Sequence, residues 1–400
     1  MPTARVTSSA RPFIRRNLRR GLAARAASGK VVFAADGLSV LQNAVALDVN
    51  ESVKEYYGKT LSSSSDLKTS ACTTPSRPSS RLREVLKDVP DEVKAKYYGC
   101  GSPTPLGIDG LRVLDLGSGS GRDCYVAAAL VGESGSVTGV DMTVEQLEVA
   151  RKHAAEYCTS TLRYKEPNMR FVEGYIEDLA SAGVEDDSVD LIVSNCVINL
   201  STDKSAVLSE AYRVLSNGGE LYFSDVYCDR RLSDEARSHE ILYGECLGGA
   251  LYLEDFKRLC MSTGFTDPRV VEGHEIEVQD EELKAVVGEA KFYSITYRLF
   301  KLPPGRLETL CEDYGQVAVY KGTIEGHPHA YSLDDHHRFE KAKPMLVCGN
   351  TASMVGESWL APHFEVSGDR STHFGLFDCS PAPVTAAPAP AATGGGGSCC

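Results

Sequence analysis

The feature that most constrains the fold of this chain is a regular alternation of strand-like and helical segments that begins at Leu111. Short apolar runs are typical of buried strands, and most are followed by a segment with the spacing of an amphipathic helix. The predicted strands are residues 111–117, 136–141, 169–176, 189–195 and 220–227, and the predicted helices start at Arg122 or span 144–157 and 204–215. This order indicates a parallel sheet with helices on both faces, so we expect a doubly wound α/β domain.

The length of the chain, 400 residues of which 42% are apolar, is enough for two or three domains. We expect an N-terminal lid segment at 36–92, which contains a Ser/Thr/Pro-rich stretch, and the α/β domain at 93–280. After about Gln279 the alternation fades, and we expect a smaller α+β domain at 281–380. Residues 381–400 are rich in Pro, Ala and Gly and are expected to be disordered. No apolar run approaches the roughly 20 residues that cross a bilayer, so we expect no membrane span.

Positive charge is concentrated at the N-terminus of the chain. Residues 1–30 contain seven Arg and one Lys, and no acid precedes Asp36. A leader rich in Arg, Ala and Ser, without a continuous apolar core, is typical of an organellar transit peptide, so residues 1–35 are predicted to direct the protein to a plastid or mitochondrion. The alternative is a disordered basic tail on a cytoplasmic protein. The rest of the chain is acidic, which argues against nucleic acid as a partner.

Three glycines at alternate positions, Gly117, Gly119 and Gly121, follow the first predicted strand, and Asp115 lies just before them. Glycines at such a turn let the backbone approach a ligand closely, and the next helix offers its N-terminal N–H groups. A dinucleotide-binding fingerprint requires Gly or Ala where this chain has Arg122, so that fingerprint does not fit. The G-x-G-x-G form preceded by an acid resembles motif I of class I methyltransferases, which bind S-adenosylmethionine.

Further positions along the predicted strands fit the nucleoside part of such a ligand. Asp141 ends the second strand, 20 residues beyond Gly121, where a carboxylate can accept both ribose hydroxyl protons. Ile176 and Glu177 follow the third strand, from which such folds contact the adenine. The alternative is a tight turn and an unrelated acid.

The 13 cysteines are scattered through a long chain without a secretory signal, so we expect thiols rather than a disulfide framework. Cys196 directly follows the fourth predicted strand, which neighbours the first in a doubly wound sheet, so we expect it to face the ligand crevice. Cys246 follows the fifth strand, Cys72 lies in the Ser/Thr/Pro-rich stretch, and Cys100 lies just ahead of the first strand. Such thiols can be nucleophiles, soft-element ligands or small buried residues. Their spacing disfavours a zinc ribbon.

With these residues the chain resembles the arsenite S-adenosylmethionine methyltransferases from about Val53 to Phe377. The segments that carry the resemblance are YYGCGSP, VLDLGSGSGRD, GVDMT, FVEGYIEDL, SNCVINLSTDK, HEILYGECLGGALY, FYSITYRLFKL, CEDYGQVAVYKGTI, LDDHHRFEKAKP and VCGNTASM. The resemblance implies that Cys72, Cys100, Cys196 and Cys246 handle arsenic. It also implies donor contacts at Tyr98, Gly99, Gly117, Gly119, Gly121, Asp141, Met142, Ile176 and Glu177, and we include Asp115 and Asn195 in the expected cofactor site. Ser118 stands where this family often has another cysteine, and we expect no arsenic contact there.

The chemistry of trivalent arsenic suggests how such a site would act. Three thiolates can hold the pyramidal ion so that its lone pair faces the sulfonium methyl group, which makes catalysis a matter of positioning. We therefore expect no His or carboxylate base near the strand ends. Methyl transfer formally oxidises arsenic, so two of the four cysteines are expected to form a transient disulfide. Thioredoxin or glutathione would reduce it by thiol exchange, and arsenite–thiol conjugates are the expected substrates.

Other residues offer weaker signals. The run from Asp334 to His337 contains two acids and two histidines, but adjacent histidines point in different directions on regular backbone, so a structural turn is favoured over a metal site. Cys124 and Cys158 fall in predicted helices and are expected in the core. Three more cysteines, Cys311, Cys348 and Cys379, are expected to be structural. The terminal pair, Cys399 and Cys400, could scavenge arsenic or have no role.

Two other functions remain open from the sequence. The first is a methyltransferase for a small organic acceptor such as a quinone or sterol precursor, in which the cysteines are incidental. The second is a soft-metal-binding protein without catalytic activity. An assay for methylated arsenic would separate all three.

Overall fold

The computed structural model describes residues 51, 53–57, 79–100 and 103–379. These residues belong to one compact unit that spans Asn50–Cys400. The predicted leader at 1–35, the tail at 381–400, and Cys72, Cys399 and Cys400 lie outside the described residues. None of the helices in the described part of the chain is long and apolar enough to cross a membrane.

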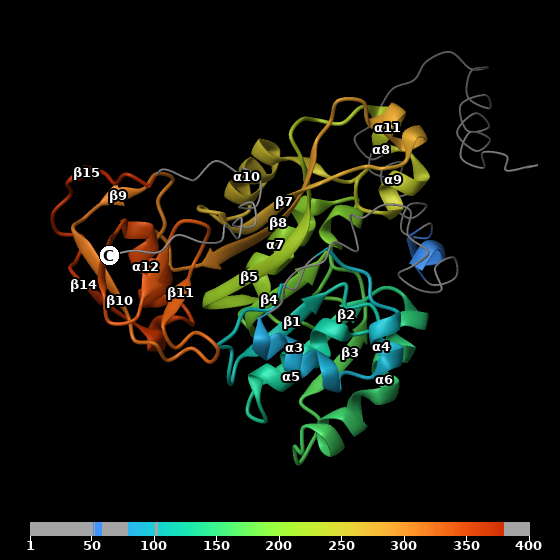
Figure 1. Cartoon of the computed structure of the whole chain (residues 1–400), viewed down its shortest axis with the longest axis horizontal. Coiled ribbons are helices and arrows are strands. Elements are labelled where there is room, and N and C mark those ends of the chain that lie inside the picture. The colour runs from blue at the N-terminus through green and yellow to red at the C-terminus, as the bar shows by residue number, and fades with distance from the viewer. Residues whose placement is uncertain (1–50, 52, 58–78, 101–102, 380–400) are drawn as a thin grey trace, which may run out of the picture. The chain divides into compact units, whose positions relative to one another are not determined.

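A large sheet forms the centre of the molecule, with strand order β3-β2-β1-β4-β5-β8-β7 and β6 paired to β5 (Figure 1). Its strands are β1 (Arg112–Leu116), β2 (Ser136–Asp141), β3 (Met169–Glu173), β4 (Val189–Asn195), β5 (Leu215–Cys228), β6 (Leu251–Tyr252), β7 (Arg269–Ile276) and β8 (Phe292–Lys301). Strands β1 to β6 pair in parallel, whereas β8 runs antiparallel to both β5 and β7. The strand order reverses between β1 and β4, which is the place where doubly wound sheets bind ligands.

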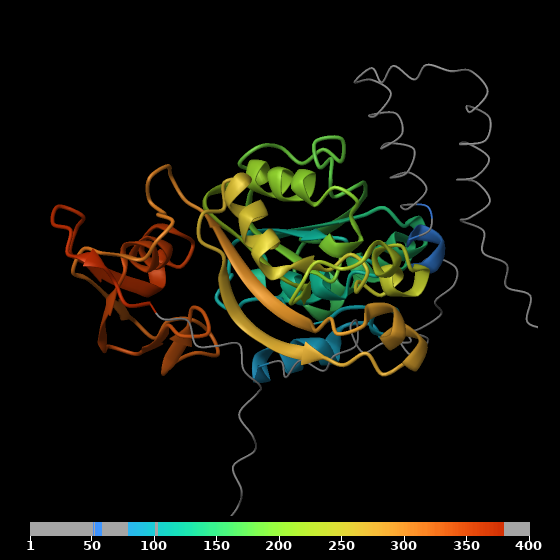
Figure 2. The same cartoon turned by 90° about the horizontal axis from the view of Figure 1, so that it is seen from above.

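Helices cover both faces of this sheet, as Figure 2 shows. They are α3 (Ser80–Asp88), α4 (Asp91–Ala95), α5 (Arg122–Val131), α6 (Val144–Glu156), α7 (Lys204–Val214), α8 (Asp234–Arg237), α9 (Glu240–Gly244), α10 (Leu253–Ser262) and α11 (Glu281–Val287). Short helical turns span Tyr157–Thr161, Ile198–Leu200 and Ala361–His363. The prediction of a doubly wound α/β domain is confirmed.

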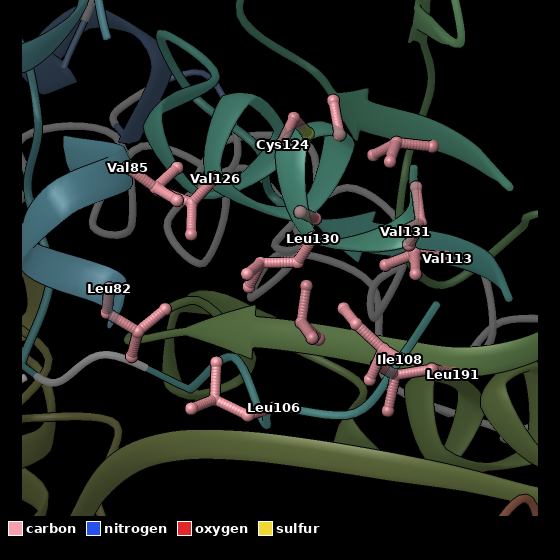
Figure 3. Close-up of a cluster of buried hydrophobic side chains, with 14 of the residues drawn as sticks. Leu82, Val85, Leu106, Ile108, Val113, Cys124, Val126, Leu130, Val131 and Leu191 are labelled. Carbon is pink, nitrogen blue, oxygen red and sulfur yellow. The ribbon is translucent and has the colours of Figure 1, made fainter. Parts of the chain in front are cut away.

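The two core layers follow directly from the alternation of side chains along the strands. Val113 and Leu191 pack with α3 and α5 on one face (Figure 3), in a cluster that also includes residues of α6. The next residues, Leu114 and Ile192, pack with α7 and α10 on the other face. Successive strand residues point to opposite faces, so a strand that is apolar throughout can fill both layers. This explains why the predicted strands are continuous apolar runs.

The structure corrects one expected boundary. The segment FYSITYRLFK forms β8 and belongs to the large sheet, although it was expected in the C-terminal domain at 281–380. It pairs with β5 along the whole run from Gly219–Lys301 to Cys228–Phe292. The strand-helix alternation ends before β8 because this strand is antiparallel to β5. Only parallel neighbours need a crossover connection, which is usually a helix. The large sheet therefore extends to Lys301.

Part of the expected lid is also core. Residues 80–88, inside the predicted lid at 36–92, form α3, whose Leu82 and Val85 are buried in the cluster that Figure 3 shows. Ser79 caps this helix by accepting a hydrogen bond from the N–H of Leu82 at 3.2 Å. The described part of the lid segment that follows residue 78 is thus packed against α5.

The C-terminal part is built from short strands and one helix. They are β9 (Glu312–Asp313), β10 (Gln316–Tyr320), β11 (Ala330–Ser332), β12 (Arg338–Glu340), β13 (Pro344–Val347), α12 (Gly349–Glu357), β14 (Phe364–Ser367) and β15 (Gly375–Leu376). Strand β10 lies between β13 and β14 in an antiparallel sheet. A fully buried ion pair in the large sheet, Arg298 of β8 with Glu220 of β5, holds this part in place. Arg298 donates a hydrogen bond to the Leu333 carbonyl, and the Trp359 side chain donates one to Glu220.

Candidate active site

A cleft lies beyond the carboxyl ends of β1, β2 and β4. Its empty space, open solvent included, is about 960 Å³. The walls come from four segments of the sheet and from residues ahead of it. The lining residues include Val53, Tyr57, Tyr97, Tyr98, Asp115, Gly117, Gly119, Asp141, Met142, Ile176, Glu177, Asn195 and Cys196. Most of the predicted cofactor-binding residues therefore border one cleft.

The glycine loop shows three different reasons for glycine. At Gly117, with φ +68°, a Cβ would lie 2.3 Å from Val197 Cγ1, so only glycine fits. At Gly119, with φ +52°, a Cβ would meet nothing within 4 Å, so this backbone faces open space. At Gly121, which begins α5 with φ +90°, a Cβ would lie 2.9 Å from the Phe171 ring. Gly121 is not among the residues that line the cleft, and its role here is packing.

Asp141 connects the second strand to this loop. Its carboxylate accepts hydrogen bonds from the backbone N–H groups of Gly119 and Thr143, both at 2.8 Å. Burial raises the pKa of this carboxyl above its ordinary value. The residue that follows, Met142, also lines the cleft. The second strand thus delivers an oxygen acceptor beside the glycine backbone.

Acidic groups lie beneath the glycine loop. Asp115 and Asp123 both line the cleft. Burial, followed by the charge of Asp123, raises the pKa of Asp115 to about 8, and the Cys124 thiol donates to its carboxylate at 3.2 Å. Asn195, at the end of β4, donates to Asp123 at 3.0 Å. Asp115 is therefore mostly protonated near pH 7, and Asp123 is already paired with Arg122. A cationic group bound beside Asp115 would favour its ionised form.

On the other side of the cleft, Ile176 and Glu177 follow β3. The Ser201 hydroxyl donates to Glu177 at 2.5 Å, so Glu177 is tied to the segment that follows β4. Gly99 does not line the cleft. It packs against Tyr97, because a Cβ at Gly99 would lie 2.1 Å from the Tyr97 hydroxyl oxygen. Its neighbour Tyr98 does line it.

Three of the four predicted cysteines meet beside the cleft. Cys196 lies directly after β4, lines the cleft and is joined to Cys100 by a disulfide with a Cα–Cα distance of 5.9 Å. The backbone N–H of Cys100 donates to the Asn195 side chain at 3.0 Å, which anchors the YYGCG segment to the end of β4. In this structure the pair is therefore in its oxidised form.

Cys246 completes this group. Its thiol donates to the Cys196 carbonyl at 2.9 Å, and the sulfur lies within 4.8 Å of both the Cys196 sulfur and an Asp225 oxygen. Both Cys196 and Cys246 adopt positive φ, +56° and +66°, which is uncommon for residues with a side chain. Such backbone strain is concentrated at functional sites. Residues 50 positions apart in the chain thus place their sulfurs side by side.

Asp225 is a site residue that the sequence analysis missed. It lies in the FSDVY run at the end of β5 and is fully buried, and its carboxylate accepts hydrogen bonds from the N–H groups of Asn199 and Val226 at 3.0 and 2.8 Å. Burial raises its pKa to about 7 and lowers the pKa of nearby Lys204 to about 8. From the sequence we expected no His or carboxylate base near the strand ends, and Asp225 was not singled out as a candidate. An acid just before the end of the fifth strand was the available signal.

Several lining residues were also missed, among them Tyr57, Thr143 and Gln146. The Gln146 amide donates to the Tyr57 carbonyl at 3.0 Å, so the helix that follows β2 holds a segment from far upstream in the sequence. Spacing within the sheet could not reveal this contact.

The residues with weaker signals lie in three different surroundings. In the His/Asp run, Asp334 accepts the His337 N–H and pairs with Arg269 at 3.0 Å, so protein groups already satisfy it. Cys124 and Cys158 are buried in the core, as predicted. Cys311, Cys348 and Cys379 are more than isolated structural residues, because their sulfurs lie within 4.8 Å of one another.

Comparisons with known proteins agree with this geometry. Residues 108–289 match the family model described as a methyltransferase domain. The arsenite methyltransferase of Aquipseudomonas alcaligenes is 58% identical over 82% of this chain and 94% of its own length, and that of Homo sapiens is 44% identical over 79% and 83%. A crystal structure of the arsenic(III) S-adenosylmethionine methyltransferase of Chlamydomonas reinhardtii is 66% identical, covers 75% of this chain and 100% of its own, and superposes with a TM-score of 0.73.

Proposed function

Because this chain belongs to the arsenite methyltransferase family, we propose that it transfers the methyl group of S-adenosylmethionine to trivalent arsenic held by cysteine thiolates. The observation that carries this proposal is the convergence of Cys196, Cys246 and Cys100 at the edge of the glycine-lined cleft. A small-molecule methyltransferase needs the cleft, but it does not need three sulfurs beside it.

The residues of the cleft fit the methyl donor. The backbone at Gly119 faces open space where a side chain would intrude, and Asp141 offers a half-buried carboxylate. Asp115 and Asp123 also line the cleft, and a bound cation would favour the ionised form of Asp115. Gly117, Asp141, Met142, Ile176 and Glu177 would hold the nucleoside and methionine parts. When bound, S-adenosylmethionine supplies an electrophilic sulfonium methyl group.

The cysteines would hold the second substrate. Arsenite exchanges its hydroxyl groups for thiolates, and three sulfurs leave the arsenic lone pair on the open side of a pyramid. Cys196 lines the cleft, so this group can direct the lone pair toward it. Because the reacting atoms must be held at roughly 3 to 3.5 Å, the chain acts mainly by positioning. Asp225 lies beside two of these sulfurs and can take up a thiol proton as arsenic binds.

The bond between Cys100 and Cys196 suggests how the redox cycle is closed. Methyl transfer raises the formal oxidation state of arsenic by two. Two thiols can supply the two electrons that reduce it again by forming one disulfide. We propose that Cys100 and Cys196 form this bond and that thioredoxin or glutathione then reduces it by thiol-disulfide exchange. Cys72, outside the described residues, is proposed as a fourth arsenic-handling thiol. It should be dispensable for a monomethylated substrate, which needs fewer thiolates.

A labelled-product assay tests the proposed function. Purified protein is incubated with arsenite, a thiol reductant and S-adenosylmethionine that carries a radiolabelled methyl group, and the products are separated by chromatography. Labelled methylarsenicals are expected. Label found only in a quinone or sterol acceptor, or arsenic that binds without accepting label, would replace this function with one of the alternatives.

We also propose that residues 1–35 are a transit peptide for a plastid or mitochondrion. The support is the acid-free, Arg-rich composition of this leader. Fusing residues 1–35 to a fluorescent protein should direct it to one organelle. Diffuse fluorescence would favour a cytoplasmic enzyme with a basic tail.

A further inference from the structure

A second group of three cysteines lies in the C-terminal part of the chain. Cys311 precedes β9, Cys348 is the N-cap of α12, and Cys379 follows β15. Figure 1 shows these three elements close together. The three sulfurs lie within 4.8 Å of one another. Cys348 is buried, whereas Cys311 and Cys379 are partly exposed, so a small solute can reach the group from solvent.

Three separate backbone interactions bring these sulfurs together. Strand β15 pairs with β9, and beyond this pairing the N–H of Phe377 donates to the Cys311 carbonyl at 2.8 Å. The N–H of Cys379 then donates to the Phe377 carbonyl at 2.9 Å, which turns the chain back toward Cys311. The approach of Cys379 to Cys311 thus follows from hydrogen-bonded backbone, and Cys348 joins them from the start of α12.

The surroundings favour a thiolate at Cys348. Its sulfur accepts the N–H of Thr351 at 3.4 Å in the first turn of α12, where the helix dipole favours negative charge. The Arg269 guanidinium lies 3.8 Å from the same sulfur. A thiolate is the form that binds soft ions.

This group is separate from the cleft. Arg269, which contacts Cys348, begins β7, and β7 lies three strands from β4 in the order β4-β5-β8-β7. At the usual strand spacing this is about 14 Å, too far for one ion to be shared with Cys196 at the end of β4. Asp115 and the other cleft residues play no part in the second group.

We propose that Cys311, Cys348 and Cys379 form a second binding site for trivalent arsenic, distinct from the one at which methyl transfer takes place. Among the His, Cys, Asp and Glu residues within the described ranges, this group offers three ligand atoms and no fourth. Three sulfurs match the pyramidal coordination of trivalent arsenic, whereas structural zinc sites use four protein ligands. The identity of the ion rests on the proposed function, which brings arsenite to this chain.

The binding reaction is balanced without an oxidant. One arsenite molecule, As(OH)₃, reacts with two thiols and one thiolate. Three As–S bonds form and three hydroxyl groups leave as water, two of them with the thiol protons of Cys311 and Cys379 and the third with a proton from solvent, since Cys348 is already a thiolate. The product ties the segments before β9, before α12 and after β15 to one atom. Arsenite therefore stabilises the C-terminal part when it occupies this site, because a ligand that binds only the folded state raises its stability.

The test uses the full-length protein in which Cys196→Ser and Cys246→Ser are combined to remove the first site. After reduction, arsenite is added and excess is removed by desalting, and bound arsenic is measured by mass spectrometry. The expected loss on adding Cys348→Ser is one arsenic atom per chain. Adding Cys260→Ser, which replaces a buried cysteine of α10, should remove none.

A second measurement on the unmodified protein keeps the test valid if these variants fold poorly. Iodoacetamide alkylation followed by peptide mass spectrometry reports on each cysteine separately. Arsenite should slow alkylation of Cys311 and Cys379 at least tenfold. Unchanged alkylation, or one zinc ion bound at these cysteines in the purified protein, would overturn the proposal. The methylation assay above is scored independently, so failure of one proposal is distinguishable from failure of the other.

Discussion

The described part of the chain contains two groups of converging cysteines, and their surroundings differ in charge and access. At the cleft, Cys196 and Cys246 lie beside the buried carboxylate of Asp225. In the C-terminal part, Cys348 lies beside the Arg269 guanidinium at the start of a helix. Only the first group borders a cleft with a glycine loop. Sulfur donors alone thus do not make a methyltransferase site, because transfer requires an electrophile held next to them.

The largest expected effect tests whether the C-terminal part is an integral portion of the fold. Arg298→Met leaves Glu220 buried without its cation, which should cost about 3 to 5 kcal/mol in the free energy of unfolding. Urea unfolding at pH 7 measures this. Arg258→Met, which removes an exposed pair with Asp255, should cost less than about 1 kcal/mol. Equal costs for the two variants would mean that the buried pair does not join the two regions.

The next effect distinguishes the two cysteine groups by chemistry. Cys196→Ser removes the sulfur that lines the cleft, so methylation of arsenite should fall by at least about 100-fold, since displaced reacting atoms cost this much. The labelled-product assay measures it, with Cys260→Ser as the matched control. The assignment of Cys196 to the arsenic site would be contradicted if Cys196→Ser kept an activity within threefold of the unmodified protein. A threefold change corresponds to roughly 0.7 kcal/mol in the activation barrier.

A smaller effect tests the carboxylate that only the cleft group has. Asp225→Asn keeps the shape of the side chain but removes the charge beside Cys196 and Cys246. The rate of arsenite methylation should fall about tenfold. This loss is smaller than the usual effect of removing a proton acceptor, because the hydroxide released by arsenite also takes up thiol protons. Asp229→Asn, just beyond the end of β5, is the control. If both variants retain full activity, Asp225 has no part in arsenic binding.

A pH-dependent effect on stability is expected at Asp115. Its pKa is raised to about 8 in the folded protein, so the folded state holds a proton that the unfolded state releases near its ordinary value of 3.8. The stabilisation is complete below pH 3.8 and is lost as pH rises toward and through 8. Between pH 5 and 9 the unmodified protein should therefore lose stability relative to Asp115→Asn. Thermal unfolding across this range measures the difference, and parallel curves would refute the buried, protonated carboxyl.

The smallest effect separates two glycines of one loop. Gly119→Ala places a methyl group in the open space of the cleft, so KM for S-adenosylmethionine should rise about threefold, roughly 0.7 kcal/mol, with kcat little changed. Both substitutions strain a backbone with positive φ, but Gly121→Ala should lower stability further, because its Cβ would also lie 2.9 Å from the Phe171 ring. If Gly121→Ala raised KM alone, that residue would belong to the cleft after all.

Much of the fold could be predicted because its signals are local. Continuous apolar strands, the glycine loop after β1 and Asp141 after β2 are each legible within a few residues, and parallel strands place such ends at one edge. The position of Cys196 after β4 follows from the same rule. The antiparallel return of β8 beside β5 was missed, because strand order at a sheet edge depends on long-range pairing.

The sequence by itself determined that thiols, acids and glycines follow the strands of a doubly wound sheet, since strand ends and turn residues are set by neighbours in the chain. Only the tertiary structure decided which of these groups touch. It brought Cys100 to Cys196, Asp225 to Cys246, and Cys311 to Cys348 and Cys379. The physical reason is that contacts between distant segments depend on how helices and loops pack over the sheet. The spacing of residues along the chain does not determine the distance between such segments in the folded protein.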